Sequence, residues 1–340
     1  MATRNELLTV FKSAMKPNLA QFSQASADNA AINAILETYN LKDATSREIL
    51  ARQPEVFAIM EEAVEELLPA AVEDIMGDYA ETKVFARDAE PIFTVSRVGK
   101  ARARMSIVEG ARGGIYKARR LDNKNMTVPV KVMTVGTFIT LEEILLNKVS
   151  LADLMANITQ GFVEQIYIKT VEAMRTAKTL APAANIKSGN GVQFDSLDSL
   201  IRIAAAYGSP VIIGFRSAVA KLNNATGWTG VTATLPDADK DDVRNRGFVG
   251  IYRGTPVVEL PNYLIDETNS GFVFGEGDLF VLTTEGRPVK IAMKGDLHIE
   301  ETPHPTGSRE QNAHRLIGVG LLMANNVCVY TDTSITGGKY

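Results

Sequence analysis

The fold is decided by residues 150–177, which read SLADLMANITQGFVEQIYIKTVEAMRTA. Ser150 with Asp153 is typical of a helix N-terminus, where such side chains bond amides that have no partner within the helix. About 27 helical residues span roughly 40 Å at 1.5 Å per residue. Because apolar side chains recur at helical spacing, we predict one long helix from Leu151 to about Ala177. These side chains are Leu154, Met155, Ile158, Phe162, Ile166, Val171 and Met174.

Before this helix the pattern changes to the two-residue period of β-strands. Apolar side chains alternate with basic or polar ones over 101–107, and a return strand over 115–121 is also basic. Alternation resumes over 126–140, which would place three valines on one side, Val128, Val130 and Val132. We predict an extended basic β-hairpin within 91–138. Such a hairpin has little core of its own and must lie on another surface.

The N-terminal segment, 1–90, predicts a largely helical arm. Short helical patterns cover 30–39 and 46–52, and Pro54 suits the first turn of a further helix. Apolar side chains then recur at helical spacing from Val56 onward. The intervening glutamates are interpreted as a solvated helix face. They are Glu61, Glu62, Glu65 and Glu66.

The C-terminal part predicts a compact α/β unit. Residues 196–206 and 215–222 have helical patterns, and Pro210 to Gly214 is an apolar run that suits a buried strand. A hairpin is expected over 250–258, turning at Arg253-Gly254. Further strands are expected at 279–283, 289–293, 316–323 and 327–330. With the long helix and the basic hairpin, these elements indicate an α+β fold.

Charge is distributed unevenly along the 340 residues, whose formal net charge is −4. Residues 1–90 carry a net charge of −8, whereas residues 91–131 carry +8. Opposite patches on identical copies can meet across an interface. The contrast therefore predicts self-association through the basic hairpin. Nucleic-acid binding is the weaker alternative, because only Tyr116 offers a stacking ring among the basic residues.

The sequence shows no residue pattern that is typical of a catalytic or metal-binding site. The three histidines, His298, His304 and His314, show no i,i+4 pair, and a single cysteine forms no metal-binding cluster. Cys328 lies between two valines, where a buried apolar role is expected. No catalytic, cofactor-binding or metal site is predicted. We find neither an apolar run long enough for a membrane span nor a signal peptide at the start.

In the order of its segments, from about Val56 to Tyr330, the chain resembles the tailed-bacteriophage major capsid proteins of the Hong Kong 97 type. Three stretches carry the resemblance. The first is TLEEILL at 140–146, a short predicted helix that leads to the helix start at 150–153. The second is SPVIIGFR at 209–216, and the third is GIYRGTPVV at 250–258 followed by HRLIGVG at 314–320.

The resemblance implies a division of the chain into five parts. These are an N-terminal helical arm at 1–90, an extended β-hairpin loop at 91–138, a peripheral domain at 139–192 containing a long spine helix, an axial α/β domain at 193–330 and a tail at 331–340. Strands returning from 280–315 would complete the peripheral domain.

The resemblance also implies a function without enzymatic activity. Copies would assemble through hexamers and pentamers into an icosahedral shell around packaged double-stranded DNA, held without sequence specificity. The protein would belong to the virion and assemble in the host bacterial cytoplasm. Scaffolding, portal and decoration proteins are expected partners, and a membrane is not.

Within this picture the expected intersubunit contact is the basic face of the hairpin, formed by Arg102, Arg104, Lys117, Arg119 and Arg120. Some relatives crosslink a loop lysine to an asparagine of a neighbour. Lys100, Lys117 and Lys124 lie in the loop here, but no partner position matches, so noncovalent contacts are expected.

Three other classes remain open on the sequence alone. An encapsulin nanocompartment shell shares the fold and would enclose cargo enzymes. A soluble α+β enzyme would require a convergent polar site. A nucleic-acid-binding protein would bind DNA with an affinity that falls steeply as salt rises.

Overall fold

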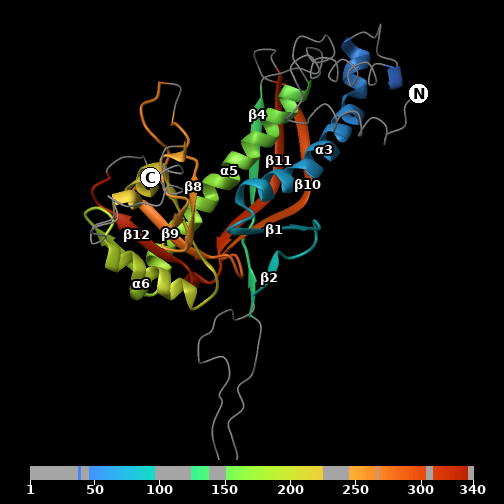
Figure 1. The fold of residues 1–340 in the computed structure, drawn as a ribbon. Coiled ribbons are helices and arrows are strands. Elements are labelled where there is room, and N and C mark those ends of the chain that lie inside the picture. Colours follow the sequence, from blue (N-terminus) through green and yellow to red (C-terminus); the bar gives the residue numbers. More distant parts are fainter. Residues whose placement is uncertain are drawn as a thin grey trace, which may run out of the picture.

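The computed structural model describes residues 37–39, 46–95, 124–137, 151–224, 245–265, 268–303 and 309–335. Two long helices and a four-stranded sheet form one part, and a six-stranded sheet with shorter helices forms a second (Figure 1). The predicted α+β class is therefore confirmed. The helices predicted at 30–39 and 140–147, and the strands predicted at 101–107 and 115–121, lie wholly or mostly outside the described residues.

The four-stranded sheet has the order β1-β10-β11-β4. Its strands are β1 (Ala80–Phe85), β10 (Val289–Pro303), β11 (Arg309–Leu321) and β4 (Lys131–Thr137). β10 runs parallel to β1 and antiparallel to β11, and β11 runs antiparallel to β4. One face packs on both long helices through a shared apolar core, to which Ile291, Met293 and Ile317 contribute.

The long helix predicted from residue 151 is confirmed as α5 (Leu151–Leu180), which lies along this sheet in Figure 1. Its apolar stripe is buried, with Phe162 and Ile166 fully enclosed. Gly161 weakens a helix by about 1 kcal/mol relative to alanine. It is explained by β4, because a Cβ at this position would lie 3.0 Å from the Val135 side chain.

The other long helix, α3 (Ser46–Met76), is one element where two were predicted. Pro54 lies inside it and not in a first turn, so the predicted helix start was wrong. An interior proline costs roughly 3 kcal/mol. The apolar stripe that follows offsets this cost, because Met60, Val64 and Leu68 are completely buried against α5 and the sheet. Tertiary packing here outweighs the local preference.

The strand predicted over 126–140 is broken in two. β3 (Lys124–Thr127) pairs with β2 (Ile92–Val95) in a separate small sheet, and β4 starts after Pro129. The break reverses the side-chain alternation, so Val128 is buried whereas Val132 is 64% exposed. The expected single valine face was therefore wrong, because Pro129 supplies no amide to a ladder.

The six-stranded sheet has the order β5-β12-β9-β6-β8-β7. Its strands are β5 (Ile186–Gly189), β12 (Cys328–Asp332), β9 (Asp278–Thr283), β6 (Pro210–Phe215), β8 (Thr255–Leu260) and β7 (Ile251–Tyr252). The helices α6 (Phe194–Ala205) and α7 (Arg216–Ala220) pack against it. Short 3-10 turns cover Ala183–Asn185, Lys221–Asn224 and Ala324–Asn326.

The hairpin predicted at 250–258 is confirmed. β7 and β8 pair through Tyr252 and Thr255. Arg253 and Gly254 both have positive φ, 50° and 79°. Two positive φ values are the signature of the tight turn that matches strand twist, which explains the Gly254 preference.

Candidate assembly surfaces

The basic residues predicted to contact a neighbouring copy cannot be placed. Arg102, Arg104, Lys117, Arg119 and Arg120 lie outside the described residues, as does Lys100. Lys124 begins β3, where its backbone pairs with Val95. The expected contact therefore remains a prediction.

The glutamates of α3 divide into two pairs. Glu62 and Glu66 are exposed, as predicted for a solvated face. Glu61 and Glu65 instead turn toward the four-stranded sheet and are half-buried. Glu61 Oε1 accepts the Ile299 backbone amide at 2.6 Å, and Glu65 Oε1 accepts from Arg315 Nη2 at 3.2 Å. The solvated reading was wrong for this pair, because both residues face the strands.

Arg315 is the charged side chain of this contact whose burial costs the most desolvation free energy. Its side chain is 0% exposed, and Nε and Nη1 have no hydrogen-bond partner among the described residues. Burial lowers the pKa of the Arg315 guanidinium, although the charge of Glu65 opposes this. Burial also raises the pKa of the Glu65 carboxyl, against the effect of Arg315. The Glu65–Arg315 pair holds α3 on β11, although burying the two charged groups costs desolvation free energy.

A second polar contact joins β1 to β10. The buried Lys290 ammonium donates to Glu81, which also pairs with Lys83 at 2.8 Å. Burial alone would raise the pKa of the Glu81 carboxyl, but the hydrogen bonds from Lys290 and Lys83 lower it below its usual value. The carboxylate therefore holds the two strands together in its charged form.

The C-terminal end of α5 is tied to the six-stranded sheet. Asp278, at the start of β9, pairs with Lys178 at 2.6 Å and with Arg175 at 3.1 Å. The Arg175 guanidinium also lies 5.2 Å from the centre of the Phe274 ring. These contacts join the C-terminal end of α5 to the start of β9 and so connect the two parts of the molecule.

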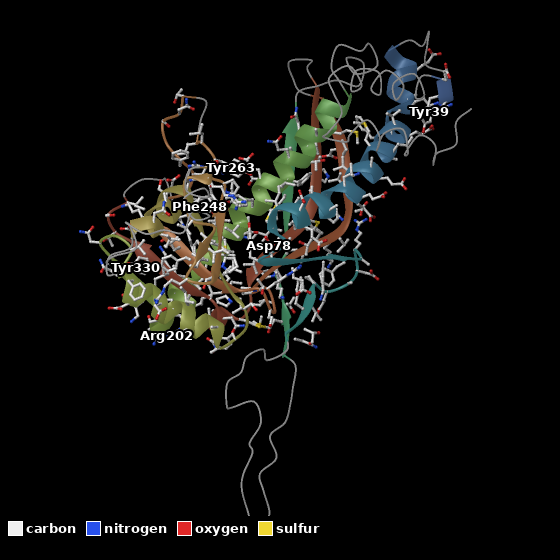
Figure 2. All side chains as sticks on the ribbon, viewed as in Figure 1. Tyr39, Asp78, Arg202, Phe248, Tyr263 and Tyr330 are labelled. Carbon is white, nitrogen blue, oxygen red and sulfur yellow. The ribbon has the colours of Figure 1, made fainter. Side chains whose placement is uncertain are left out.

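An apolar loop tip protrudes from the six-stranded part. Leu264 and Phe272 form an isolated antiparallel bridge and are 47% and 42% exposed, and Ile265 beside them is also exposed. Tyr263, labelled in Figure 2, lies at its base and packs edge-on against Tyr167 of α5, with 5.5 Å between the ring centres. An apolar cluster on a supported loop is suited to contact with another protein surface.

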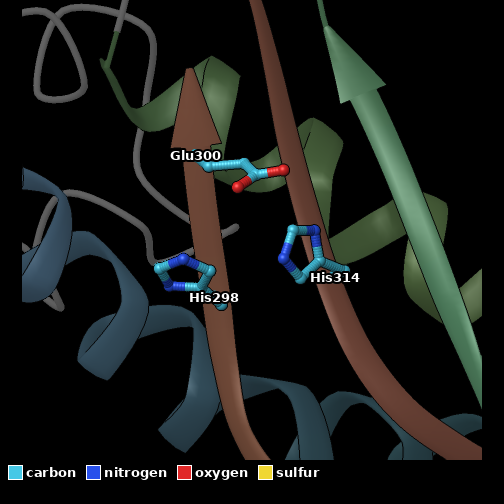
Figure 3. Close-up of side chains that lie close together, drawn as sticks. All are labelled: His298, Glu300 and His314. Atoms are coloured by element: carbon cyan, nitrogen blue, oxygen red, sulfur yellow. The ribbon is translucent and has the colours of Figure 1, made fainter. Parts of the chain in front are cut away.

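The structure brings together a group that the sequence did not predict. His298 of β10 lies directly opposite His314 of β11, with ring centres 5.2 Å apart. Glu300 follows two residues after His298, on the same face, and Figure 3 shows the three side chains gathered over the two strands. The alternation Asp296-Leu297-His298-Ile299-Glu300 indicates a strand, but only the pairing register reveals the neighbouring histidine.

Cys328 is buried in β12, as predicted. Burial raises the pKa of its thiol to about 12, so the reactive thiolate is strongly disfavoured. No helix among the described residues is both long and apolar enough to cross a membrane.

Several solved structures are similar to the chain, all at low identity. A chain of the satellite phage P4 procapsid that includes the size determination protein is 13% identical, with a TM-score of 0.48 over 92% of this chain and 98% of that one. A chain of the bacteriophage PhiM1 mature capsid is 13% identical, with a TM-score of 0.47 over 76% and 87%. A chain of the holo-SrpI encapsulin complex of Synechococcus elongatus is 11% identical, with a TM-score of 0.41 over 75% and 88%.

No curated protein matches the sequence. A family model does match it over residues 6–321, and its description is "SPbeta prophage-derived putative capsid protein YonB". The chain belongs to this phage capsid family. It is a structural subunit that forms the shell of a phage virion, and the tailed-phage capsid class inferred from the segment order is confirmed.

Proposed function

We propose that the chain assembles through hexamers and pentamers into an icosahedral shell that encloses a double-stranded DNA phage genome. The family match over residues 6–321 carries this proposal. The protein acts without catalysis in this role, assembles in the host cytoplasm and holds DNA without sequence specificity. Scaffolding, portal and decoration proteins are its further partners.

The experiment that tests this proposal is cryo-electron microscopy of particles formed by the full chain, with the contents of phage particles analysed in parallel. Five-fold and six-fold clusters of the subunit are expected in the particles. Phage particles should contain nuclease-protected double-stranded DNA. Particles filled with a cargo enzyme and free of DNA would identify an encapsulin and contradict the proposal.

We further infer that the basic face of the 91–138 loop docks on acidic groups of an adjacent copy. The support is the charge contrast, −8 over residues 1–90 against +8 over residues 91–131. Each exposed ion pair contributes only about 0–1 kcal/mol, but a shell repeats the contact in every subunit.

Charge reversal tests this contact. Replacing Arg102, Arg104, Arg119 and Arg120 by glutamate should abolish assembly or lower particle stability. A control variant reverses two exposed arginines of the six-stranded part, Arg202 and Arg216, of which Arg202 is labelled in Figure 2. Unchanged assembly of the four-residue variant would contradict the proposed contact.

A further inference from the structure

We propose that His298, Glu300 and His314 form a binding site for a divalent transition-metal ion, of the class that Zn²⁺ represents. Each side chain offers one ligand atom, and these atoms all lie within 4.8 Å of one another. The site goes beyond the shell-forming role, and all three of its ligands come from β10 and β11 of a single chain.

Strand pairing gives this group its geometry. His298 and His314 are direct partners in the β10–β11 ladder, and side chains at such positions project from the same face. Glu300 projects from that face as well, since side chains two residues apart on a strand share a side. Figure 3 shows the carboxylate of Glu300 above the two rings. Two histidines and one carboxylate therefore converge from two paired strands.

The ligand chemistry suits borderline metals. Imidazole nitrogen binds Zn²⁺ at about 2.0–2.1 Å and carboxylate oxygen at about 2.0–2.2 Å, and three protein ligands leave a position for water. Ligand atoms in such a site are about 3.4 Å apart, so atoms that now lie up to 4.8 Å apart must approach by as much as about 1.4 Å. The exposed Glu300 side chain can supply much of this movement by rotating toward the two rings.

Glu61 of α3 orients the first histidine. Its Oε1 atom lies 3.0 Å from His298 Nδ1 and is itself held by the Ile299 amide. A carboxylate can only accept a hydrogen bond, so this contact favours the tautomer with the proton on Nδ1. His298 Nε2 is then left with a lone pair for the metal. A carboxylate behind a ligating histidine is the usual arrangement in metal sites, where it fixes the ring and increases its basicity.

The surroundings supply charges of both signs. The two histidines line a cavity of about 500 Å³ together with Glu61, Asp296, Arg87 and Lys294. The carboxylates of Glu61 and Asp296 favour a bound cation, whereas Arg87, Lys294 and Arg315, which also lines the cavity, oppose it. Binding must therefore come from direct coordination and not from the overall electrostatic field. The site should then select metals that prefer nitrogen ligands and discriminate against Ca²⁺ and Mg²⁺.

Calorimetric titration of the full chain with Zn²⁺ tests the proposal. One ion per chain is expected, and Co²⁺ in its place should give the visible absorption of a low-symmetry site with nitrogen ligands. His298→Ala and His314→Ala should each weaken Zn²⁺ binding at least tenfold. Glu61→Gln should weaken it about tenfold, as loss of an outer partner typically does.

Two control variants make the outcome decisive. Glu172→Gln removes an exposed carboxylate of α5, and His304→Ala removes the third histidine. Both should bind Zn²⁺ as the unaltered chain does. The proposal is overturned if the chain binds no Zn²⁺, if the His298→Ala/His314→Ala double variant binds it as tightly as the unaltered chain, or if His304→Ala lowers the affinity equally.

Discussion

At the scale of single residues, the polar contacts between α3 and the four-stranded sheet are the contacts that the sequence pattern predicted least well. The glutamates Glu61, Glu62, Glu65 and Glu66 are identical in type, and helical spacing alone assigns them to the polar side. Two of them meet Ile299 and Arg315 only because β10 and β11 arrive from far along the chain. A sequence gives the charge of each side chain, but it does not give the distant residue that the side chain contacts.

Glu65 is expected to stabilise the fold by neutralising a buried guanidinium. Glu65→Ala leaves Arg315 without its carboxylate partner and should lower the free energy of unfolding by about 2 kcal/mol, measured by urea denaturation of the unassembled subunit. Glu55→Ala, which removes an exposed pair with Arg52 on the same helix, should cost less than about 1 kcal/mol.

Replacing both buried partners separates charge from packing. A Glu65→Leu/Arg315→Met variant should recover most of the stability lost by Glu65→Ala, since apolar side chains need no compensation for desolvation. Equal stability of Glu65→Ala and the unaltered chain would show that Arg315 does not depend on this carboxylate.

Glu81 should make stability depend on acid pH. Its pKa is lowered in the folded chain from the ordinary value of 4.5, so the unfolded chain binds the proton more tightly. The contribution is therefore present above about pH 4.5 and is lost as the pH falls through the folded-state pKa. The stability difference between the unaltered chain and Glu81→Gln should shrink between pH 6 and pH 3, by urea denaturation at each pH. A difference that is constant or grows on acidification would contradict the pairing with Lys290.

At the scale of elements, the periodicity of apolar residues predicted the helices and strands that bury one long face. It did not predict where tertiary packing interrupts or lengthens an element. α5 was predicted from Leu151 because its apolar stripe is regular. The part of β10 beyond Met293 was not predicted. Polar side chains occupy its exposed face, so this part lacks the apolar run of a fully buried strand. The break at Pro129 depends on β3 and β4 joining different sheets, which a local pattern does not encode.

Two glycines of β11 provide a matched test of sheet packing. A Cβ at Gly318 would collide with the Pro129 carbonyl oxygen, whereas a Cβ at Gly320 would meet Val128 at an ordinary 3.5 Å. Gly318→Ala should therefore destabilise the chain by about 1–3 kcal/mol. Gly320→Ala should change the free energy of unfolding by less than about 1 kcal/mol. Thermal unfolding of the two variants side by side checks this, and equal effects would refute the close approach of β11 to Pro129.

At the scale of the whole molecule, the segment order predicted the class of protein, whereas its contact surfaces could not be derived from sequence. The basic hairpin was predicted from charge and period alone, and its contact with another copy stays a prediction, because residues 101–121 lie outside the described part of the chain. The apolar tip at Leu264, Ile265 and Phe272 was not predicted, because single apolar residues in a loop look the same whether buried or exposed.

We expect this loop tip to contact a second copy in the shell. Leu264→Ser with Phe272→Ser should prevent capsomer formation while leaving the unfolding midpoint of the subunit unchanged, because both side chains are exposed in the single chain. Val84→Ser, which changes a single exposed side chain on β1, serves as the control. Sedimentation velocity distinguishes subunits from capsomers, and normal assembly of the double variant would exclude the loop from the interface.

The central claim is that this chain builds a shell. Negative-stain electron microscopy of the purified full chain, with size-exclusion chromatography beside it, tests that claim most directly. We predict closed shells, tubes or ring-shaped capsomers that increase with protein concentration. A chain that stays monomeric or dimeric at every concentration, also when co-expressed with the scaffolding protein of its phage, would contradict the claim.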